Sequence, residues 1–379
     1  MVAGEASGDL LGAHLIASLN ERRPELRFSG IGGPKMISRG FKSHFPMEKL
    51  SVRGYAEVLR HYREIAGIRR QLGERLLAER PSLFIGVDAP DFNLDLERRL
   101  KLSGIPTIQY VCPSVWAWRG GRVRKIARSV NHVLALFPFE PEIYRKAGVP
   151  VTYVGHPLAD QIPLDVDKAE ARAQLRLPLR KLIIALLPGS RRSELQYMAE
   201  TFVKTARRLS EEVKDVHFVC PTVSRETRDL FEEALRQHGD PELPVTLLFG
   251  HSHEALAAAD LALVASGTAT LEAALFGTPM IITYRMSPVS WTIMRRMGYL
   301  PYVGLPNILA GEFIAPEYLQ GNATPGVLAE ALIALMGDGP RQRRQIEKFR
   351  EIHEMLRQNT SQKAADAVLG VLDATRVHG

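Results

Sequence analysis

The sequence is nearly devoid of cysteine and has no long apolar run. Cys112 and Cys220 are the only cysteines in 379 residues, and their separation matches no metal-ligand spacing. We expect both to be reduced core thiols of a cytoplasmic protein. The longest apolar runs, such as Leu182–Leu187, have about six residues, whereas a membrane-spanning helix needs ~20. We expect neither a transmembrane helix nor a signal peptide.

Several common motifs are missing as well. The segments Gly4–Asp9 and Gly30–Pro34 are glycine-rich, but neither matches G-x-G-x-x-G, which excludes the dinucleotide fingerprint. No P-loop lysine follows the glycine of Leu187–Glu194. The sequence also has no internal repeat and no low-complexity segment. Three histidines lack partners at metal-ligand spacing and are expected to be structural: His14, His156 and His251.

The composition is that of a soluble globular protein, with 45% hydrophobic and 24% charged residues. At this length two domains are expected. The net charge of +7 and the pI near 9.4 favour an anionic partner: nucleic acid, acidic lipid or a phosphorylated substrate. Charge alone does not choose among these partners.

Short β-type runs alternate with longer helical patterns, which predicts βαβ units and a parallel sheet in each half of the chain. In the first half we predict strands at Met1–Ala3, Arg27–Ile31, Leu83–Val87, Thr107–Cys112, Val133–Phe137 and Val151–Val154. In the second half we predict them at Leu182–Leu187, Val216–Cys220, Val245–Phe249, Leu261–Val264 and Met280–Tyr284. The proline- and charge-rich segment Pro157–Arg180 is the predicted linker.

Helix signals are clear near both ends of the chain. The first helix is predicted at Leu10–Asn20, and Thr324 is a predicted N-cap followed by proline at the first helical position. The polar tail from Arg341 to about Thr375 is predicted to be helical. Only three residues precede Gly4, although a central strand usually has five or six. We therefore expect that the natural start lies upstream or that the chain is trimmed.

The segment Phe84–Asn93 is the most informative in the chain. Its apolar run ends at Asp88, after which Pro90 and Asp91 break the pattern. Ligands of open α/β sheets bind beyond the carboxyl ends of the strands. A carboxylate at that point can accept a proton from a sugar hydroxyl. The competing interpretation is that Asp88 and Asp91 cap the following helix.

Three turns carry further candidates. In Gly4–Asp9 the glycines allow close approach of a ligand; we expect Asp9 to cap its own helix and Glu5 to contact substrate. Arg191 can bind pyrophosphate oxygens bidentately, unless its turn is simply a solvated loop. The run Ser266–Thr268 presents N–H groups and hydroxyls at a helix N-terminus. Glu272, one turn further, either accepts from ribose hydroxyls or favours the helix dipole.

The remaining candidates carry weaker signals. Asn307 is either a ligand or a turn residue, and Arg285 is a candidate phosphate ligand at a strand end. Trp116 and Trp118 either wall a pocket or pack in the core. The stretch Val52–Leu72 combines apolar residues at helical spacing with several arginines. That pattern is typical of a helix on an anionic membrane or of an ordinary helix with a solvated basic face.

Together these motifs resemble the lipid-A-disaccharide synthase family, over nearly the whole chain and in the same order. They are Val2–Asp9, Gly86–Phe92, Tyr110–Trp118, Leu187–Arg191 and Ala265–Glu272. The first three are specific to this family, and the last two are similar to general nucleotide-sugar motifs of GT-B glycosyltransferases. Three departures are the short first strand, Cys112 where serine is also common, and Arg192 after the family's arginine. None removes a candidate catalytic residue.

The resemblance implies an α/β protein of GT-B fold: two Rossmann-like domains that face a cleft, with C-terminal helices packing back across. It implies an N-terminal acceptor-binding and membrane-docking domain at 1–163 and a C-terminal nucleotide-sugar-binding domain at 164–345. The C-terminal helices at 346–379 would return to the N-terminal domain of their own or a neighbouring chain.

The implied reaction joins UDP-2,3-diacylglucosamine to 2,3-diacylglucosamine 1-phosphate (lipid X), giving lipid A disaccharide 1-phosphate and UDP. The β-1,6 linkage inverts an α-linked donor, which needs a base on the acceptor face and stabilisation of the departing UDP. Asp88 is the implied base, assisted by Glu5 or Asp91. The implied donor site comprises Gly189, Ser190, Arg191, Ser266, Gly267, Thr268, Glu272, Arg285 and Asn307. No cofactor is expected, and no metal, because no D-x-D motif occurs at a predicted strand end.

A protein with lipid substrates is expected to be peripheral on the cytoplasmic face of the inner membrane. The basic stretch near 52–70 would dock on that anionic surface through Val58, Leu59, Tyr62 and Ile65. The acyl-chain length and the oligomeric state, a homodimer included, stay open.

Two alternatives remain within the same fold: a UDP-N-acetylglucosamine 2-epimerase-like enzyme and a peptidoglycan-type glycosyltransferase. Both would share the second-half motifs but not the run Gly86–Asp91. A non-enzymic nucleic-acid binder is suggested only by the pI, since the sequence has no recognisable nucleic-acid module. We expect no nucleic-acid partner.

Overall fold

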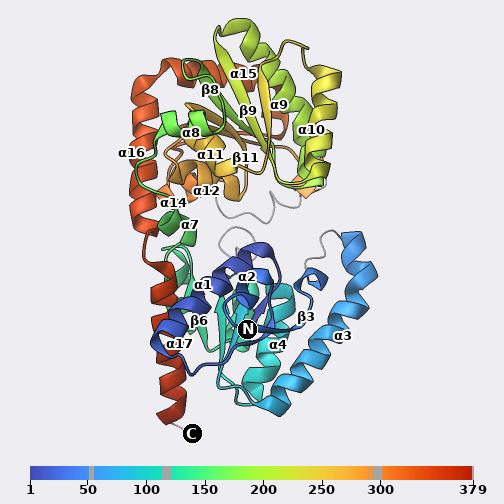
Figure 1. The fold of residues 1–379 in the computed structure, drawn as a ribbon, viewed down its shortest axis with the longest axis vertical. Coiled ribbons are helices and arrows are strands. Elements are labelled where there is room, and N and C mark those ends of the chain that lie inside the picture. The colour runs from blue at the N-terminus through green and yellow to red at the C-terminus, as the bar shows by residue number, and fades with distance from the viewer. Residues whose placement is uncertain (51–54, 113–120, 289, 293–300, 378–379) are drawn as a thin grey trace. The chain divides into compact units, whose positions relative to one another are not determined.

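The computed structural model describes residues 1–50, 55–112, 121–288, 290–292 and 301–377 (Figure 1). For residues 55–62 and 375–377 only the backbone is described. The chain divides into two compact units, the first formed by Met1–Asp160 with Leu356–Gly379 and the second by Gln161–Met355. Each unit contains one parallel sheet, which confirms the predicted α/β class. The unit limits differ from the predicted domain limits mainly near the C-terminus, where the second unit extends ten residues past 345.

The sheet of the first unit has seven parallel strands in the order β3-β2-β1-β4-β5-β6-β7. The strands are β1 (Val2–Ala3), β2 (Ser29–Ile31), β3 (Lys42–Phe45), β4 (Phe84–Val87), β5 (Thr107–Tyr110), β6 (His132–Ala135) and β7 (Val151–Tyr153). Although β1 has two residues, it pairs with both β2 and β4 and is central. The strand order reverses between β1 and β4, so their carboxyl ends form the topological switch point where ligands of such sheets bind. The edge strand β3 was not predicted.

Helices connect these strands and cover the sheet. They are α1 (Ala6–Arg22), α2 (Pro34–Ile37), the 3₁₀ helix η1 (Met47–Lys49), α3 (Tyr55–Glu79), α4 (Pro90–Leu102), α5 (Arg122–Ser129), α6 (Glu140–Lys146), α7 (Pro157–Gln161) and α17 (Thr360–Val377). In α1, Leu11, Leu15 and Leu19 recur every four residues, which gives the helix one apolar face, and all three are buried in the core of the unit.

The C-terminal helix α17 packs on the first unit of its own chain (Figure 1). Arg22 pairs with Asp366, and apolar residues of α17 enter the core that also contains α1. The predicted tail helix is in fact two helices, because the chain turns at Asn359 with a φ of 55°. The carboxylate of Asp160 accepts the N–H groups of Asn359 (3.0 Å) and Thr360 (2.6 Å) and so caps α17.

The second unit has six parallel strands in the order β10-β9-β8-β11-β12-β13, with its switch point between β8 and β11. The strands are β8 (Leu182–Leu187), β9 (Val216–Thr222), β10 (Val245–Phe249), β11 (Leu261–Ala265), β12 (Met280–Tyr284) and β13 (Glu317–Leu319). The helices include α8 (Lys168–Gln174), α9 (Arg192–Glu212), α10 (Arg225–His238), α11 (Ser252–Ala258), α12 (Thr268–Leu275), α14 (Leu305–Ala310), the 3₁₀ helix η2 (Gln320–Asn322), α15 (Pro325–Gly337) and α16 (Gly339–Leu356). The predicted cap of α15 is confirmed: the Thr324 side chain accepts the N–H of Val327. The edge strand β13 was not predicted.

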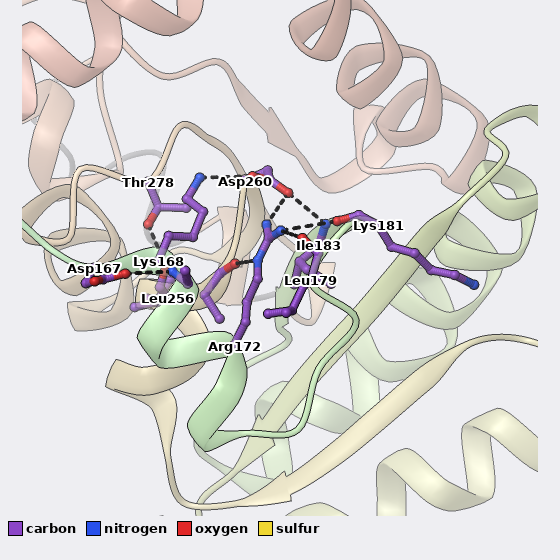
Figure 2. A network of polar contacts seen from close by, with 11 residues as sticks. Asp167, Lys168, Arg172, Leu179, Lys181, Ile183, Leu256, Asp260 and Thr278 are labelled. Carbon is purple, nitrogen blue, oxygen red and sulfur yellow. Dashed lines mark hydrogen bonds and ion pairs between the residues drawn. The ribbon is translucent and has the colours of Figure 1, made fainter.

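A buried arginine fixes α8 to the amino ends of the second sheet (Figure 2). Arg172, which is 8% exposed, donates to Asp260 Oδ2 (2.6 Å) and to the carbonyl of Ala258 (2.9 Å). Asp260 also accepts the N–H of Ile183 (2.9 Å) and the ammonium of Lys168 (2.9 Å). Because Ile183 lies on β8 and Asp260 directly precedes β11, this network joins the linker segment to both central strands.

Replacing the buried arginine should destabilise the second unit. We expect Arg172→Met to lower the free energy of unfolding by at least about 2 kcal/mol, because the carbonyls of Ala258, Leu179 and Lys181 lose their donor. Chemical unfolding followed by circular dichroism measures this. The matched control is Arg192→Met, whose side chain is 63% exposed and pairs with Glu226 at 2.9 Å. Its loss should stay below about 1 kcal/mol, and equal losses in the two variants would contradict the role given to Arg172.

Candidate functional site

Asp88 follows β4 directly and lies against the turn that follows β1. The N–H of Gly4 donates to Asp88 Oδ1 (2.9 Å), while Oδ2 is buried and makes no hydrogen bond of ordinary geometry in the described part of the chain. The N-cap of α4 is Ala89, with no side-chain cap, so the capping interpretation of Asp88 and Asp91 is wrong. Asp91 instead pairs with Arg122 at 2.6 Å.

Glycine is required where α1 meets this carboxylate. A Cβ on Gly8 would lie 2.1 Å from Asp88 Oδ2, far inside van der Waals contact. A Cβ on Gly4 would lie 2.6 Å from the Cβ of Ala89. The glycines of the first motif therefore let the backbone approach the aspartate of the next strand.

The surroundings of Asp88 shift its titration to neutral pH. Burial raises the pKa of Asp88 to about 7, the backbone N–H groups of Gly4, Glu5 and Gly8 act in the opposite direction, and the charge of Glu5 raises it. A carboxyl group with such a pKa is partly ionised at neutral pH and can accept a proton from a hydroxyl.

The backbone is strained around Asp88. Asp88 and Ala89 have φ values of 57° and 41°, and Val111, at the end of the neighbouring strand β5, has 67°. A positive φ is uncommon outside glycine and is unfavourable for a β-branched residue such as valine. Strain of this kind concentrates at functional sites, where the surrounding structure imposes it.

The two other acids of the first motif have different surroundings. Glu5 is the N-cap residue of α1 and is half-buried beside Asp88. Asp9 does not cap its own helix as predicted. Its carboxylate accepts the N–H groups of Gly33 (2.9 Å), Lys35 (2.9 Å) and Met36 (3.0 Å), and so caps α2.

In the second unit, the turn after β8 exposes a cation. The carboxylate of Glu194 accepts the N–H groups of Ser190 (2.8 Å) and Arg191 (3.2 Å), which fixes the turn. Gly189 has a φ of 127°, and a Cβ there would lie 2.6 Å from the Cβ of Glu194. The Arg191 side chain is 60% exposed, so its guanidinium is accessible to an anion.

The turn after β11 lies beside the turn after β8, because β8 and β11 are neighbours. Gly267 precedes α12 with a φ of 156°, and Thr268 begins the helix. The hydroxyl of Ser266 donates to the carbonyl of Val303 (2.9 Å), so it holds a neighbouring loop. The two predicted phosphate-binding turns therefore meet at the switch point of the second sheet.

Glu272 has a partner that the sequence did not indicate. His253 Nε2 lies 3.6 Å from Glu272 Oε2, and its ring contacts Phe276 at a centroid distance of 5.3 Å. The Glu272 carboxylate beside the ring raises the pKa of His253 above its ordinary value. Sequence reasoning missed His253 because no spacing pattern links it to Glu272.

Asn307 is fully buried, and its amide is fully engaged. Its Nδ2 donates to Ala315 O (2.7 Å) and Glu317 (2.8 Å), and its Oδ1 accepts the N–H groups of Ile314 and Ala315, both at 2.9 Å. Glu317, which sequence reasoning also missed, accepts the N–H of Gly304 at 2.9 Å. These contacts leave the Asn307 amide without a group directed at a ligand.

The remaining predicted residues are less informative. Arg285 follows β12, and its guanidinium donates to Thr201 on α9 (3.2 Å). Ile65 packs against the core of the first unit. The predicted roles of five residues fall on side chains outside the described part of the chain: Val58, Leu59, Tyr62, Trp116 and Trp118.

In the described residues, no three His, Cys, Asp or Glu could share a metal ion, and no helix is long and apolar enough to cross a membrane.

Two parallel sheets, each with its candidate residues at a switch point, define the class of GT-B-like folds. Solved structures of this fold include the UDP-GlcNAc 2-epimerase of Neisseria meningitidis bound to UDP-GlcNAc, at 12% identity, with a TM-score of 0.62 and 98% of each chain covered. MurG of Acinetobacter baumannii has a TM-score of 0.55 at 15% identity, covering 95% of this chain and 96% of its own. These likenesses establish the fold alone.

Sequence comparison establishes the family. A profile described as lipid-A-disaccharide synthetase matches residues 1–371. The lipid-A-disaccharide synthases of Dechloromonas aromatica and Methylobacillus flagellatus are 60% and 56% identical over 376 and 372 residues, with 98% of each chain covered. The chain therefore belongs to the lipid-A-disaccharide synthase family. It is a glycosyltransferase of lipid A biosynthesis that acts on lipid A precursors, which confirms the predicted family and activity.

The close approach of α1 to Asp88 gives a direct test. We expect Gly8→Ala to lower kcat on the order of 100-fold, because the new methyl group displaces the carboxylate by about 1 Å. The KM for the nucleotide-sugar should not change, and steady-state formation of the disaccharide measures both. The control is Gly370→Ala in α17, where nothing lies within 4 Å of the new Cβ. A Gly8→Ala enzyme with parental kcat would show that the position of Asp88 does not matter.

Proposed function

We propose that the chain transfers 2,3-diacylglucosamine from UDP to the 6-hydroxyl of lipid X with inversion, giving lipid A disaccharide 1-phosphate and UDP. Membership of the family supports the class of substrate. The observation that carries the mechanism is Asp88, a half-buried carboxylate with a pKa of about 7 at the switch point of the first sheet.

In this proposal Asp88 is the general base. It takes the proton of the acceptor 6-hydroxyl, whose oxygen then bonds to the anomeric carbon of the donor. The bond between that carbon and the UDP oxygen breaks, and its electron pair leaves with UDP. Glu5, which is half-buried beside Asp88, positions the acceptor or supports Asp88.

The second unit stabilises the departing UDP. Arg191, with its exposed guanidinium, and the turn at Ser266–Thr268 bind the pyrophosphate, assisted by Arg285. Glu272 accepts from the ribose hydroxyls, with its orientation fixed by His253. We place Asn307 outside the group of direct ligands: it acts by holding the loop that also contacts Ser266.

Access to the lipid substrates comes from peripheral attachment to the inner membrane. The 25-residue helix α3 carries Arg63 and Arg70, its sequence includes the apolar residues Val58 and Leu59, and the chain has a net charge of +7. Such a helix is attracted by anionic lipid and can insert apolar side chains at the surface.

Removal of the proposed base should abolish most activity. We expect Asp88→Asn to lower kcat by about 10²–10⁴-fold, the usual contribution of general base catalysis. The assay is UDP release from UDP-2,3-diacylglucosamine and lipid X in detergent micelles, with lipid X omitted as a control. Parental rates in the variant would move the base elsewhere, with Glu5 as the next candidate.

The pKa of Asp88 also sets two pH dependences. The ionised form is the base, so kcat/KM should fall as the pH drops below about 7. The pKa of Asp88 is higher in the folded than in the unfolded protein. The contribution of Asp88 to the free energy of unfolding is therefore fully present below the unfolded pKa of about 4 and is lost as the pH rises through 7. At pH 8 the free energy of unfolding of Asp88→Asn should therefore exceed that of the parent by up to about 4 kcal/mol, whereas near pH 4 the two values should be equal. Chemical unfolding at the two pH values measures this. A variant less stable than the parent at pH 8 would contradict the raised pKa.

If α3 docks on the membrane, removing its apolar side chains should weaken binding of the protein to lipid vesicles. Replacing Val58, Leu59 and Tyr62 together by serine should reduce binding to vesicles with anionic lipid at least about tenfold, because apolar area is lost from the interface. Sedimentation with the vesicles measures this. The control is Leu102→Ser, a change at a side chain that is 78% exposed on the same unit. Unchanged binding of the triple variant would refute docking through α3.

A further inference from the structure

A buried acid on α4, the helix that follows Asp88, has no role in the reaction described above. Glu97, on α4, is fully buried, and neither of its carboxyl oxygens has a hydrogen-bond partner in the described part of the chain. Lys101, one turn further along α4, does not pair with it. The Lys101 ammonium donates instead to the carbonyls of Ala127 (3.2 Å) and Val130.

Two amide oxygens in the same part of the unit also lack a donor. Gln109 Oε1 and Asn93 Oδ1 are buried without a partner. Glu97 Oε1 and Gln109 Oε1 lie 2.3 and 3.0 Å from the point that a Cβ on Gly86 would occupy, so both oxygens lie beside that glycine. Two bare oxygens there repel each other, whereas a proton on one of them turns the contact into a hydrogen bond.

The orientation of the Gln109 amide is fixed by its nitrogen. Nε2 donates to the carbonyls of Val111 (2.9 Å) and Asp88 (3.2 Å), and the opposite orientation would set Oε1 against those carbonyls. Asn93 Nδ2 donates to the same Asp88 carbonyl at 2.9 Å. These amides therefore tie down the left-handed backbone of Asp88 and Val111, which directs the Asp88 carboxylate toward Gly4.

We propose that Glu97 is a protonated positioning residue, which donates its carboxyl proton to Gln109 Oε1 and so holds the amide that fixes Asp88 in its working conformation. This inference rests on the proposed role of Asp88 as the base. Burial raises the pKa of Glu97 well above its ordinary value, and only the backbone of Gly86 acts against this. The titratable group that interacts with Glu97 is Cys112, which itself interacts with Tyr144 and Glu140. None of them is a cation that would hold Glu97 ionised.

Two substitutions of Glu97 distinguish a protonated side chain, which donates a hydrogen bond, from an ionised one, which acts through its charge. Glu97→Gln keeps a donor for Gln109 and carries no charge, so kcat and the pH at which kcat/KM falls should both match the parent. Glu97→Met is unbranched and has no donor. It should lower kcat by about 10- to 100-fold with an unchanged KM for the nucleotide-sugar, because Asp88 is misplaced. The control is Arg98→Met, the exposed neighbour on the same helix.

An ionised Glu97 would give the opposite pattern. Its removal in Glu97→Gln would take a like charge away from Asp88 and move the acid limb of kcat/KM to lower pH. That shift, or a loss of kcat in Glu97→Gln as large as in Glu97→Met, overturns the proposal.

Infrared spectroscopy tests the proton without relying on activity or on the Met variant folding. At about pH 9 the parent should show the carbonyl band of an un-ionised carboxylic acid, and Glu97→Gln should lack it. Absence of the band in the parent overturns the proposal. If Asp88→Asn instead leaves kcat unchanged, the role of Asp88 as the base falls, whereas the infrared band still reports the proton on Glu97.

Discussion

The hydrogen bond from the Gly4 N–H to the Asp88 carboxylate joins the carboxyl ends of β1 and β4, and much of the first unit is arranged around it. It requires α1 to pass so close to Asp88 that Gly8 has no room for a side chain. It also accompanies a left-handed backbone at Asp88 and Ala89, which costs about 1–3 kcal/mol for each residue. The core beneath the sheet offsets this strain, because each large apolar side chain buried there contributes about 1.5–3 kcal/mol. The geometry of the candidate site is therefore maintained by packing far from it.

The second unit repeats the topology with the opposite chemistry. Its switch point presents the exposed guanidinium of Arg191 and the N-terminus of α12, where the first unit presents a carboxylate. Several residues of its motifs fix the conformation of loops: Glu194 accepts N–H groups of its own turn, and Ser266 donates to the carbonyl of Val303 in a neighbouring loop. A motif read from sequence therefore mixes residues that face a ligand with residues that position them, and only their hydrogen bonds separate the two kinds.

The sequence was sufficient for the central parts of both sheets, because buried parallel strands are short apolar runs that end at glycine, proline or aspartate. It was not sufficient for the edge strands β3 and β13, which are short, mix polar with apolar residues and contain no buried residue. The break in the tail at Asn359 depends on a cap from Asp160, nearly 200 residues away. Asp9 was predicted as a cap of the wrong helix for the same reason. Glu97 gave no signal, because a glutamate in a helical pattern is ordinarily a solvated residue.

The role proposed for Asp88 as the base depends on the charges near it. A cation in contact with it would lower its pKa and weaken it as a proton acceptor. Among the described residues, the interactions that shift its pKa include no cation, and Arg122 pairs with the neighbouring Asp91 instead. A second negative charge close by would raise the pKa further and leave less of the protein in the basic form at neutral pH. A neutral Glu97 avoids that effect and also avoids the cost of burying an unpaired charge. The burial of Glu97 and the role proposed for Asp88 as the base thus both favour a protonated, neutral Glu97.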